Sequence, residues 1–311
     1  MSNLNNLFYN IANAIRMASN KNEQFNIISF PNELKNIQLP ISNTSITLLD
    51  RSINNISNDT WNKIEDIRPY AFYNCKNLTG SPVCGENVTN MSSTYYGCTN
   101  LTGNAACGNN VIRMDSTYSG CTNLTGSPVC GENVKYMFYT YYNCSNLIGN
   151  AACGPNVTNM FGGYYGCTNL ITATCGDNVT DMSGAYYRCT NIINPVCGEN
   201  VTNMSSTYYG CTNLTGTPVC GNKVIYMDST YYACINLTGE PVCGDNVTNM
   251  SGTYYNCANL TGSPVCGDKV TNMDSTYYNC TNLTGSPVCG DKVTDMDRTY
   301  SNCTNLTGSP V

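Results

Sequence analysis

The sequence contains no histidine, and only 11% of its 311 residues are charged. Histidine is the usual general base of hydrolytic sites and a frequent zinc ligand, so its absence removes the simplest routes to both. The 21 cysteines include no Cys-x-x-Cys pair, and the carboxylates recur periodically instead of gathering in one place. We therefore expect a protein that is not an enzyme and that holds no metal ion or cofactor.

Two further absences concern partners and location. The net charge is −6, whereas a nucleic-acid groove needs clustered Lys and Arg, so no nucleic-acid partner is expected. No apolar run approaches the ~20 residues of a membrane-spanning helix, so membrane insertion is not expected either. The first residues also lack the basic start and the unbroken apolar stretch of a secretory signal peptide.

What the sequence does contain is one motif repeated over its last three quarters. A typical copy reads NVTNMSSTYYGCTNLTGTPVCG and carries two cysteines. The first of these recurs from Cys75 to Cys303 at intervals of 23 residues, apart from two successive intervals of 22. A fixed period of this length predicts a solenoid, in which each repeat forms one rung and stacked rungs bury a continuous core.

Columns of the repeat that keep one bulky apolar residue type are predicted to face the core, because a changed volume there would leave a void or a clash. The columns between them vary among Ser, Thr, Asn, Asp, Glu and Lys and are predicted to face solvent. A glycine follows the second cysteine in every repeat, and such a glycine usually marks a backbone angle that other residues cannot adopt. The core columns are those of Val88, Met91, Tyr95, Cys98 and Leu101.

The motif resembles the BspA-type leucine-rich repeat, and still more its mycoplasma lipoprotein-associated variant, whose core reads VTNMS-x-MF-x-GC-x-x-L. The resemblance covers roughly residues 64–311. It implies a curved, β-rich solenoid that serves surface attachment and recognition and carries no chemistry. The Tyr-Tyr pair and the second cysteine depart from the family pattern. The matching residues are Val88, Thr89, Asn90, Met91, Ser92, Tyr95, Gly97, Cys98 and Leu101, and in the first repeat Ile67, Ala71, Phe72, Cys75 and Leu78.

Apolar residues at helical spacing over residues 4–18 predict a short amphipathic helix. A polar break and a Phe-Pro pair follow it, and this order resembles the N-terminal module of tail and fibre proteins from phages of Gram-positive hosts. The alternative is a generic amphipathic cap over the first repeat. The resemblance is carried by Ile11, Ala12, Ala14, Ile15, Arg16, Phe30, Pro31 and Ile37, whereas the Lys-Thr-Gly element of that module is absent.

The predicted fold class is mainly β, a leucine-rich-repeat-type solenoid of about ten rungs of 22–23 residues with a short helical N-terminal module. We expect an attachment module over residues 1–39, atypical capping rungs over 40–67 and the solenoid over 68–311. The sequence ends at Val311 inside a rung, and we expect another copy or a partner protein to cover the apolar edge that this leaves. We therefore expect a homo-oligomer.

The cysteine columns allow two interpretations. Rungs about 4.8 Å apart bring equivalent Cα atoms within disulfide range, but parallel side chains keep their Cβ atoms slightly too far apart for a relaxed bond. The number of cysteines is also odd. We expect reduced thiols that act as small hydrophobic side chains, with disulfides down a column as the alternative.

The second tyrosine of the Tyr-Tyr pair is the candidate contact site. Its column admits Ser at 119 and 301, which favours a position facing solvent or a groove. Such a row of rings would contact a receptor by stacking on sugars or on protein aromatics, and the alternative is a purely structural ladder that stiffens the rod. The candidate residues are Tyr96, Tyr142, Tyr165, Tyr187, Tyr209, Tyr232, Tyr255 and Tyr278.

These features favour a non-enzymatic virion protein, a phage fibre or tail appendage that is attached to the particle through residues 1–39. Its solenoid would recognise a glycan or a protein on the host surface. The alternative is an extracellular or cell-surface adhesin of a bacterium or protozoan. A third interpretation, an ice- or crystal-face binder, depends only on the regular Thr columns.

Overall fold

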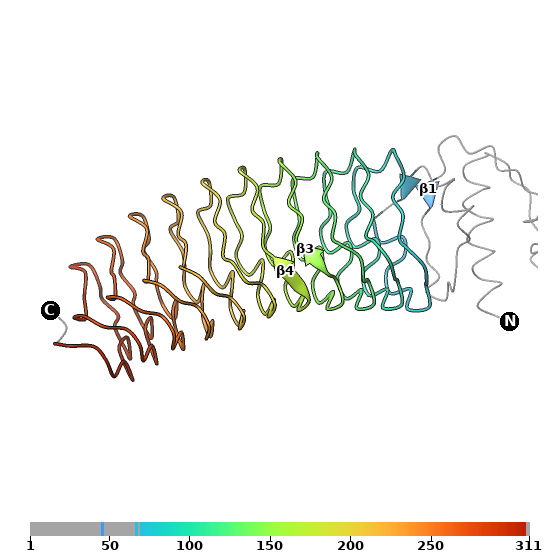
Figure 1. The fold of residues 1–311 in the computed structure, drawn as a ribbon. Helices are drawn as coiled ribbons and strands as arrows, with labels where there is room; N and C mark the ends of the chain where they lie inside the picture. The colour runs from blue at the N-terminus through green and yellow to red at the C-terminus, as the bar shows by residue number, and fades with distance from the viewer. Residues whose placement is uncertain (1–44, 47–65, 68, 309–311) are drawn as a thin grey trace, which may run out of the picture.

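The computed structural model describes residues 45–46, 66–67 and 69–308. The repeats stack along one axis as rungs of a gently curved rod (Figure 1). The helix expected over residues 4–18 and the module expected over residues 1–39 lie outside the described residues, as does most of the capping segment. The solenoid itself is confirmed.

Regular strands in the described part of the chain are few and short. They pair in parallel, β1 with β2 and β3 with β4, and the register of the second pair shifts between Gly149 and Asn150, next to the first of the shortened repeats. The chain is therefore less regularly β than the predicted fold class implies. The strands are β1 (Ser45–Ile46), β2 (Asp66–Ile67), β3 (Gly149–Asn150) and β4 (Leu170–Thr172).

One parallel bridge recurs from rung to rung and continues the β-pairing along the rod. It falls on the residue before the core methionine, so the Val-Thr-Asn-Met segment of each rung lies beside that of the next. The bridged residues are Asn90, Arg113, Tyr136, Asn159, Asp181, Asn203, Tyr226, Asn249, Asn272 and Asp295.

The rest of the Met-to-Cys segment is turn, because its backbone N–H groups alternate between two partners. The N–H of Thr207 donates to Met204 O of its own rung at 3.0 Å, while the N–H of Tyr208 donates to Thr230 O of the next rung at 2.8 Å. Ser206 between them lies in the left-handed region, with φ at 56°. Each rung is thus coiled tightly and bonded to its neighbour at every second residue.

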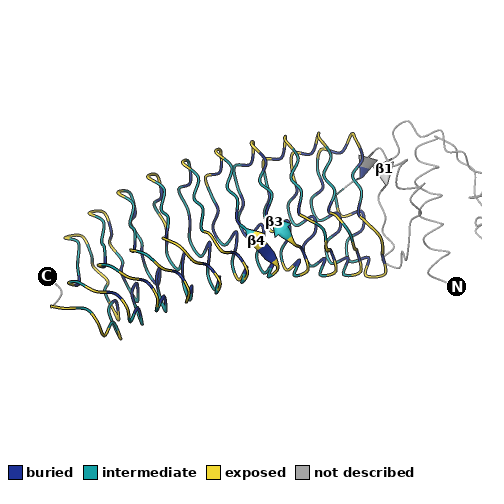
Figure 2. Cartoon of the chain, in the orientation of Figure 1, coloured by how far each residue is buried: buried dark blue, intermediate teal, exposed yellow. Residues whose placement is uncertain are grey.

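The predicted core columns are buried, as the inner walls of the rungs in Figure 2 show. Val201, Met204, Tyr208, Cys211 and Leu214 are all 0% exposed, and their equivalents pack above and below them. The assignment of these five columns to the interior is confirmed. Because the columns stack in register, one continuous apolar column runs through the rod.

The first tyrosine has a role that phenylalanine could not perform. The Tyr208 hydroxyl donates to Val196 O and accepts from Val196 N–H, both at 2.8 Å. The same pair of bonds recurs in each of ten rungs, from Tyr95 with Val83 to Tyr300 with Val288. This hydroxyl ties the Pro-Val-Cys side of the rung to the core and satisfies backbone groups that would otherwise lack partners.

One column that we expected to face solvent is buried. The Thr207 hydroxyl lies within donor range of Met182 O at 2.9 Å and of Met204 O at 2.7 Å, which links two rungs. Gly163 and Ala185 replace threonine where the column is interrupted. The solvent-facing assignment is wrong for this column, whose threonines are Thr94, Thr117, Thr140, Thr207, Thr230, Thr253, Thr276 and Thr299.

The glycine after the second cysteine also differs from its prediction. Gly221 is not among the residues of positive φ. A Cβ placed on it would lie 3.0 Å from Cys197 Sγ and 3.2 Å from Gly198 O of the preceding rung. The column keeps glycine because the rungs approach closely there, and the expected special backbone angle is not the reason.

Candidate recognition face

The second-tyrosine column forms a stack along one side of the rod. Seven successive rings are nearly parallel, with centroids 4.3–4.7 Å apart and interplanar angles of 2–25°. Ser119 interrupts the column, so Tyr96 stacks separately on Tyr73 at 4.8 Å. We call the unbroken run the tyrosine ladder; it consists of Tyr142, Tyr165, Tyr187, Tyr209, Tyr232, Tyr255 and Tyr278.

The ladder presents ring edges and hydroxyls to a partner. Its tyrosines are half-buried, and each ring inside the run has a neighbour on both faces. Burial raises the pKa of Tyr165, Tyr187 and Tyr232 above the ordinary value of 10.0, and neighbouring tyrosines raise it further. The ladder is therefore an uncharged line of hydroxyl groups that can both donate and accept hydrogen bonds.

All 21 cysteines are free thiols in the structure, as expected. In the first column the thiol donates to the carbonyl of the preceding rung, as Cys211 does to Tyr186 O at 3.0 Å. Burial raises the pKa of Cys121 and of Cys220 to about 12. Neutral thiols of this kind act as small core side chains and are poor nucleophiles.

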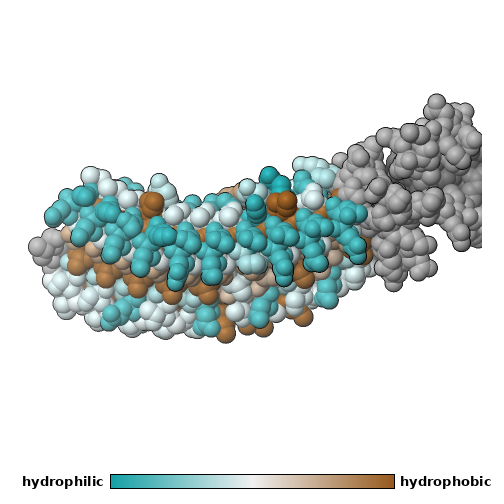
Figure 3. Space-filling model, turned by 90° about the horizontal axis from the view of Figure 1, so that it is seen from above, coloured by the Kyte–Doolittle hydropathy of each residue, from teal (hydrophilic) through white to brown (hydrophobic). Residues whose placement is uncertain are grey.

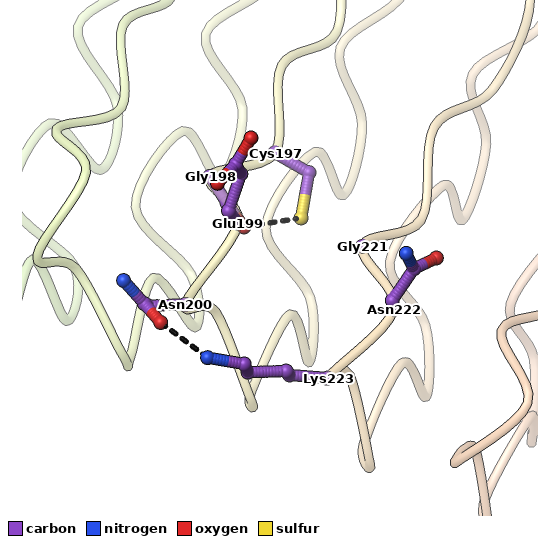
Figure 4. A pocket seen from close by; sticks show the side chains of 7 residues that line it. All are labelled: Cys197, Gly198, Glu199, Asn200, Gly221, Asn222 and Lys223. Atoms are coloured by element: carbon purple, nitrogen blue, oxygen red, sulfur yellow. Dashed lines mark hydrogen bonds between the residues drawn. The ribbon is translucent and has the colours of Figure 1, made fainter.

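The Cys-Gly corners leave a hollow of about 430 Å³ between two rungs (Figure 4). Lys223 Nζ donates to Asn200 Oδ1 at 2.6 Å and so does not face a reacting group. Cys197 Sγ lies 3.6 Å from Gly198 O, and the described residues show no hydrogen bond between this thiol and Glu199, the carboxylate that lines the same hollow. Over residues 69–308, no three Cys, Asp or Glu residues are grouped so that they could hold a metal ion.

A second hollow, of about 390 Å³, adjoins the tyrosine ladder. Aromatic residues and glycines from three successive rungs and polar residues of the fourth form it, and sequence reasoning did not find it. The only signal was the replacement of serine by Gly162 and Gly184 in one column. Its lining consists of Tyr139, Phe161, Gly162, Tyr165, Ser183, Gly184, Tyr187, Asn203, Ser205 and Ser206.

The outer surface is polar over much of its length. Figure 3 shows one long face of the rod, on which hydrophilic residues form a continuous band and hydrophobic residues lie beside it as separate spots. Only two ion pairs occur among the described residues, Arg113 with Asp115 and Arg298 with Asp297. In the same part of the chain, no helix has the length and apolar character that crossing a membrane requires.

Stacked rungs, parallel bridges and continuous apolar columns define the chain as a leucine-rich-repeat solenoid. The family described as "BspA type Leucine rich repeat region" matches residues 13–148 and 115–238, in six copies. These ranges together span well over half of the 311 residues. The chain belongs to the BspA-type leucine-rich repeat family.

Solved structures of other repeat proteins are similar to this chain. A leucine-rich repeat protein from Bacteroides ovatus is 16% identical, with a TM-score of 0.46 over 79% of this chain and 78% of that one. A leucine rich cell surface protein from Faecalibacterium prausnitzii is 16% identical, with a TM-score of 0.37 over 80% and 76%. An internalin from Listeria monocytogenes is 13% identical, with a TM-score of 0.28 over 99% and 96%. No curated protein matches the sequence.

Proposed function

We propose that this protein is a non-enzymatic recognition protein of a cell surface and that the tyrosine ladder is its contact site. The observation that carries the proposal is the ladder itself, seven stacked and half-exposed tyrosines in one line on a rod of low charge. Tyrosine combines a large apolar edge with a polar hydroxyl, which suits it to contact surfaces.

The spacing of the ladder fits an extended partner that lies along the rod. Successive rings are 4.3–4.7 Å apart, and every hydroxyl both donates and accepts. A polysaccharide chain or an extended segment of a surface protein would meet one hydroxyl per rung. Because the rings are already stacked on one another, they are preorganised and lose little conformational freedom on binding.

The placement at a cell surface is supported by the family match, which begins at residue 13, inside the segment that resembles the phage module. A virion protein attached through residues 1–39 is the second candidate, and Ile11 to Ile37 carry it. The ice-binding interpretation has less support, because one regular threonine column is buried. Two expectations remain predictions: that the repeats are most similar to the mycoplasma variant, and that copies of the chain associate.

The contact site is tested by replacing Tyr209, Tyr232 and Tyr255 together by Ser, the residue that the column already holds at 119 and 301. Wild type and variant are applied to an array of immobilised bacterial and animal polysaccharides. We expect the variant to lose binding while its circular dichroism spectrum at the assay temperature remains that of the wild type. A folded triple variant that binds as the wild type does would exclude the ladder as the site.

A matched control carries serine at Thr202, Ile225 and Thr248, in the same three rungs but in another half-buried column. It should bind like the wild type. The location is tested separately with an antibody to the repeats, by immunogold electron microscopy of intact source cells and of purified phage particles. Labelling of particles with unlabelled cells would replace the cell-surface proposal by the virion one.

A further inference from the structure

We propose that the hollow beside the tyrosine ladder binds the ring of an uncharged pyranose. The inference rests on the proposed function and adds to it the chemical class of one ligand subsite. The hollow measures about 390 Å³, within the range of small-ligand pockets. Its lining contains aromatic rings, glycines, serines and one asparagine, and no charged side chain.

The hollow lies where two successive rungs carry glycine in one column: the Tyr139 ring occupies the space over Gly162, and the space over Gly184 is open. The second residue after the core methionine is Ser206 in one rung and Ser229 in the next, but it is Gly162 and Gly184 in the two rungs that precede them. A Cβ placed on Gly184 would meet no atom within 4 Å. The position is open, so the space over the backbone is available to a ligand.

Tyr139 forms the aromatic wall. It occupies the same column one rung before Gly162, and its ring lies over that glycine, where a Cβ would overlap the ring. It stands outside the parallel stack, inclined by 82° to Tyr142 and by 71° to Phe161. Tyr139 is 36% exposed. The face of an aromatic ring is electrostatically negative, so it attracts the C–H groups of a sugar.

Three polar side chains are arranged for the hydroxyls of such a ring. Ser205 donates its own proton to Asp228 at 2.7 Å, which leaves its oxygen to accept a bond from a ligand. Asn203 Oδ1 accepts from the backbone N–H of Ser205 at 2.9 Å, which orients the amide. The amide nitrogen of Asn203 has no hydrogen-bond partner within the described residues, so it is an available donor.

Ser183 provides a second acceptor of the same kind, because its hydroxyl donates to Asp181 at 2.6 Å. Two acceptors, one donor and an aromatic wall together match a molecule that has hydroxyls on its rim and C–H groups on its face. A charged ligand would find no partner in the lining; Arg188, beside the ladder, lies over the Tyr187 ring at 5.6 Å and does not line the hollow.

A third glycine of this column shows that glycine alone does not make the site. A Cβ on Gly252 would meet Ser229 Oγ at 3.3 Å and a ring atom of Tyr232 at 3.6 Å. In this column Gly252 is preceded by Ser229 and followed by Ser275, whereas Gly184 is preceded by Gly162 and followed by Ser206. No aromatic residue of this column stands beside Gly252, which makes it a matched control position.

The test uses saturation-transfer NMR on the full chain with methyl glucoside, methyl galactoside and methyl mannoside as separate probes. We expect at least one of them to receive saturation in the wild type. Gly184→Arg fills the hollow and should weaken binding at least tenfold; Arg298 already occupies this column with φ at 53°. Tyr139→Ser removes the wall and should abolish the signal.

Two control variants make the same changes outside the hollow. Gly252→Arg and Tyr70→Ser alter the same column, and both should bind like the wild type. The proposal is overturned if no probe binds, if both hollow variants bind normally, or if glucuronate or an aromatic peptide binds more tightly than every methyl glycoside. None of these outcomes decides the proposed function. That function is tested by changing Tyr209, Tyr232 and Tyr255, which do not line the hollow.

Discussion

At the scale of single residues, the two tyrosines of each pair have different roles although they are adjacent in sequence. The first is buried, and its hydroxyl bonds both polar groups of one backbone residue across the rung, as Tyr208 does with Val196. The second is half-exposed and stacks on its equivalents, as Tyr209 does on Tyr187 and Tyr232. The difference between them is therefore a difference in the environment of one hydroxyl group.

Removal of that hydroxyl should destabilise the protein only at the buried position. Tyr208→Phe leaves the N–H and C=O of Val196 without their partner, and we expect a loss of about 1–3 kcal/mol in the free energy of unfolding. Tyr209→Phe removes a hydroxyl from a half-exposed ring that bonds no backbone group of the described residues, and it should cost less than about 0.5 kcal/mol. Urea denaturation followed by circular dichroism measures both. Equal losses in the two variants would refute the assigned roles.

At the scale of the rung, close approach between neighbouring elements decides the sequence as much as backbone conformation does. The Cys-Gly corner of one rung rests on the cysteine sulfur and the carbonyl of the rung before it. Glycine is therefore retained in this column because neighbouring rungs are in contact there. The buried threonine column has a similar function, because the hydroxyl of Thr207, for example, lies within hydrogen-bond range of the carbonyls of two successive methionines.

A compensating pair of changes tests the corner contact. Gly221→Ala places a methyl group 3.0 Å from Cys197 Sγ, and overpacking of this kind costs about 1–3 kcal/mol. Cys197→Ala removes the sulfur, so the double variant should recover part of what Gly221→Ala loses. A double-mutant cycle on the free energy of unfolding gives the coupling. Strict additivity would mean that the backbone oxygen of Gly198, 3.2 Å from the added methyl group, restricts the position and that the sulfur does not.

The core columns could be predicted from the sequence because each keeps one bulky apolar type in every repeat. The buried threonines could not, since threonine is also common on surfaces and Gly163 and Ala185 break the column. The hollow was harder still. It is formed by Gly162 and Gly184 from two rungs together with Tyr139 from a third. The sequence of a single repeat does not show that these residues lie together.

At the scale of the whole molecule, the repeated burial of neutral thiols and phenols should make the rod sensitive to alkali. Burial raises the pKa of Cys121 from 9.0 to about 12, and it raises the pKa of Tyr208 well above 10.0. Below the ordinary pKa both the folded and the unfolded chain carry the proton. Above it only the unfolded chain loses the proton, so stability falls as pH rises.

We therefore predict a melting temperature that is constant up to about pH 8 and falls between pH 9 and 12, the interval given by the two pKa values of Cys121. Each such thiol contributes up to about 1.4 kcal/mol per pH unit. Circular dichroism melts in the presence of a reductant measure this, and return to pH 7 should restore the original melting temperature. A melting temperature that stays constant to pH 11 would contradict the burial of neutral thiols.

Hydroxyl-radical footprinting of the complex shows directly whether the tyrosine ladder contacts the partner. The protein is oxidised alone and with the polysaccharide that binds it best on the array, and each residue is then quantified by mass spectrometry. We predict that oxidation of Tyr209, Tyr232 and Tyr255 falls on binding while that of Ile225, in the other half-buried column, is unchanged. If oxidation of Ile225 falls and oxidation of the three tyrosines does not change, the tyrosine ladder is not the contact site.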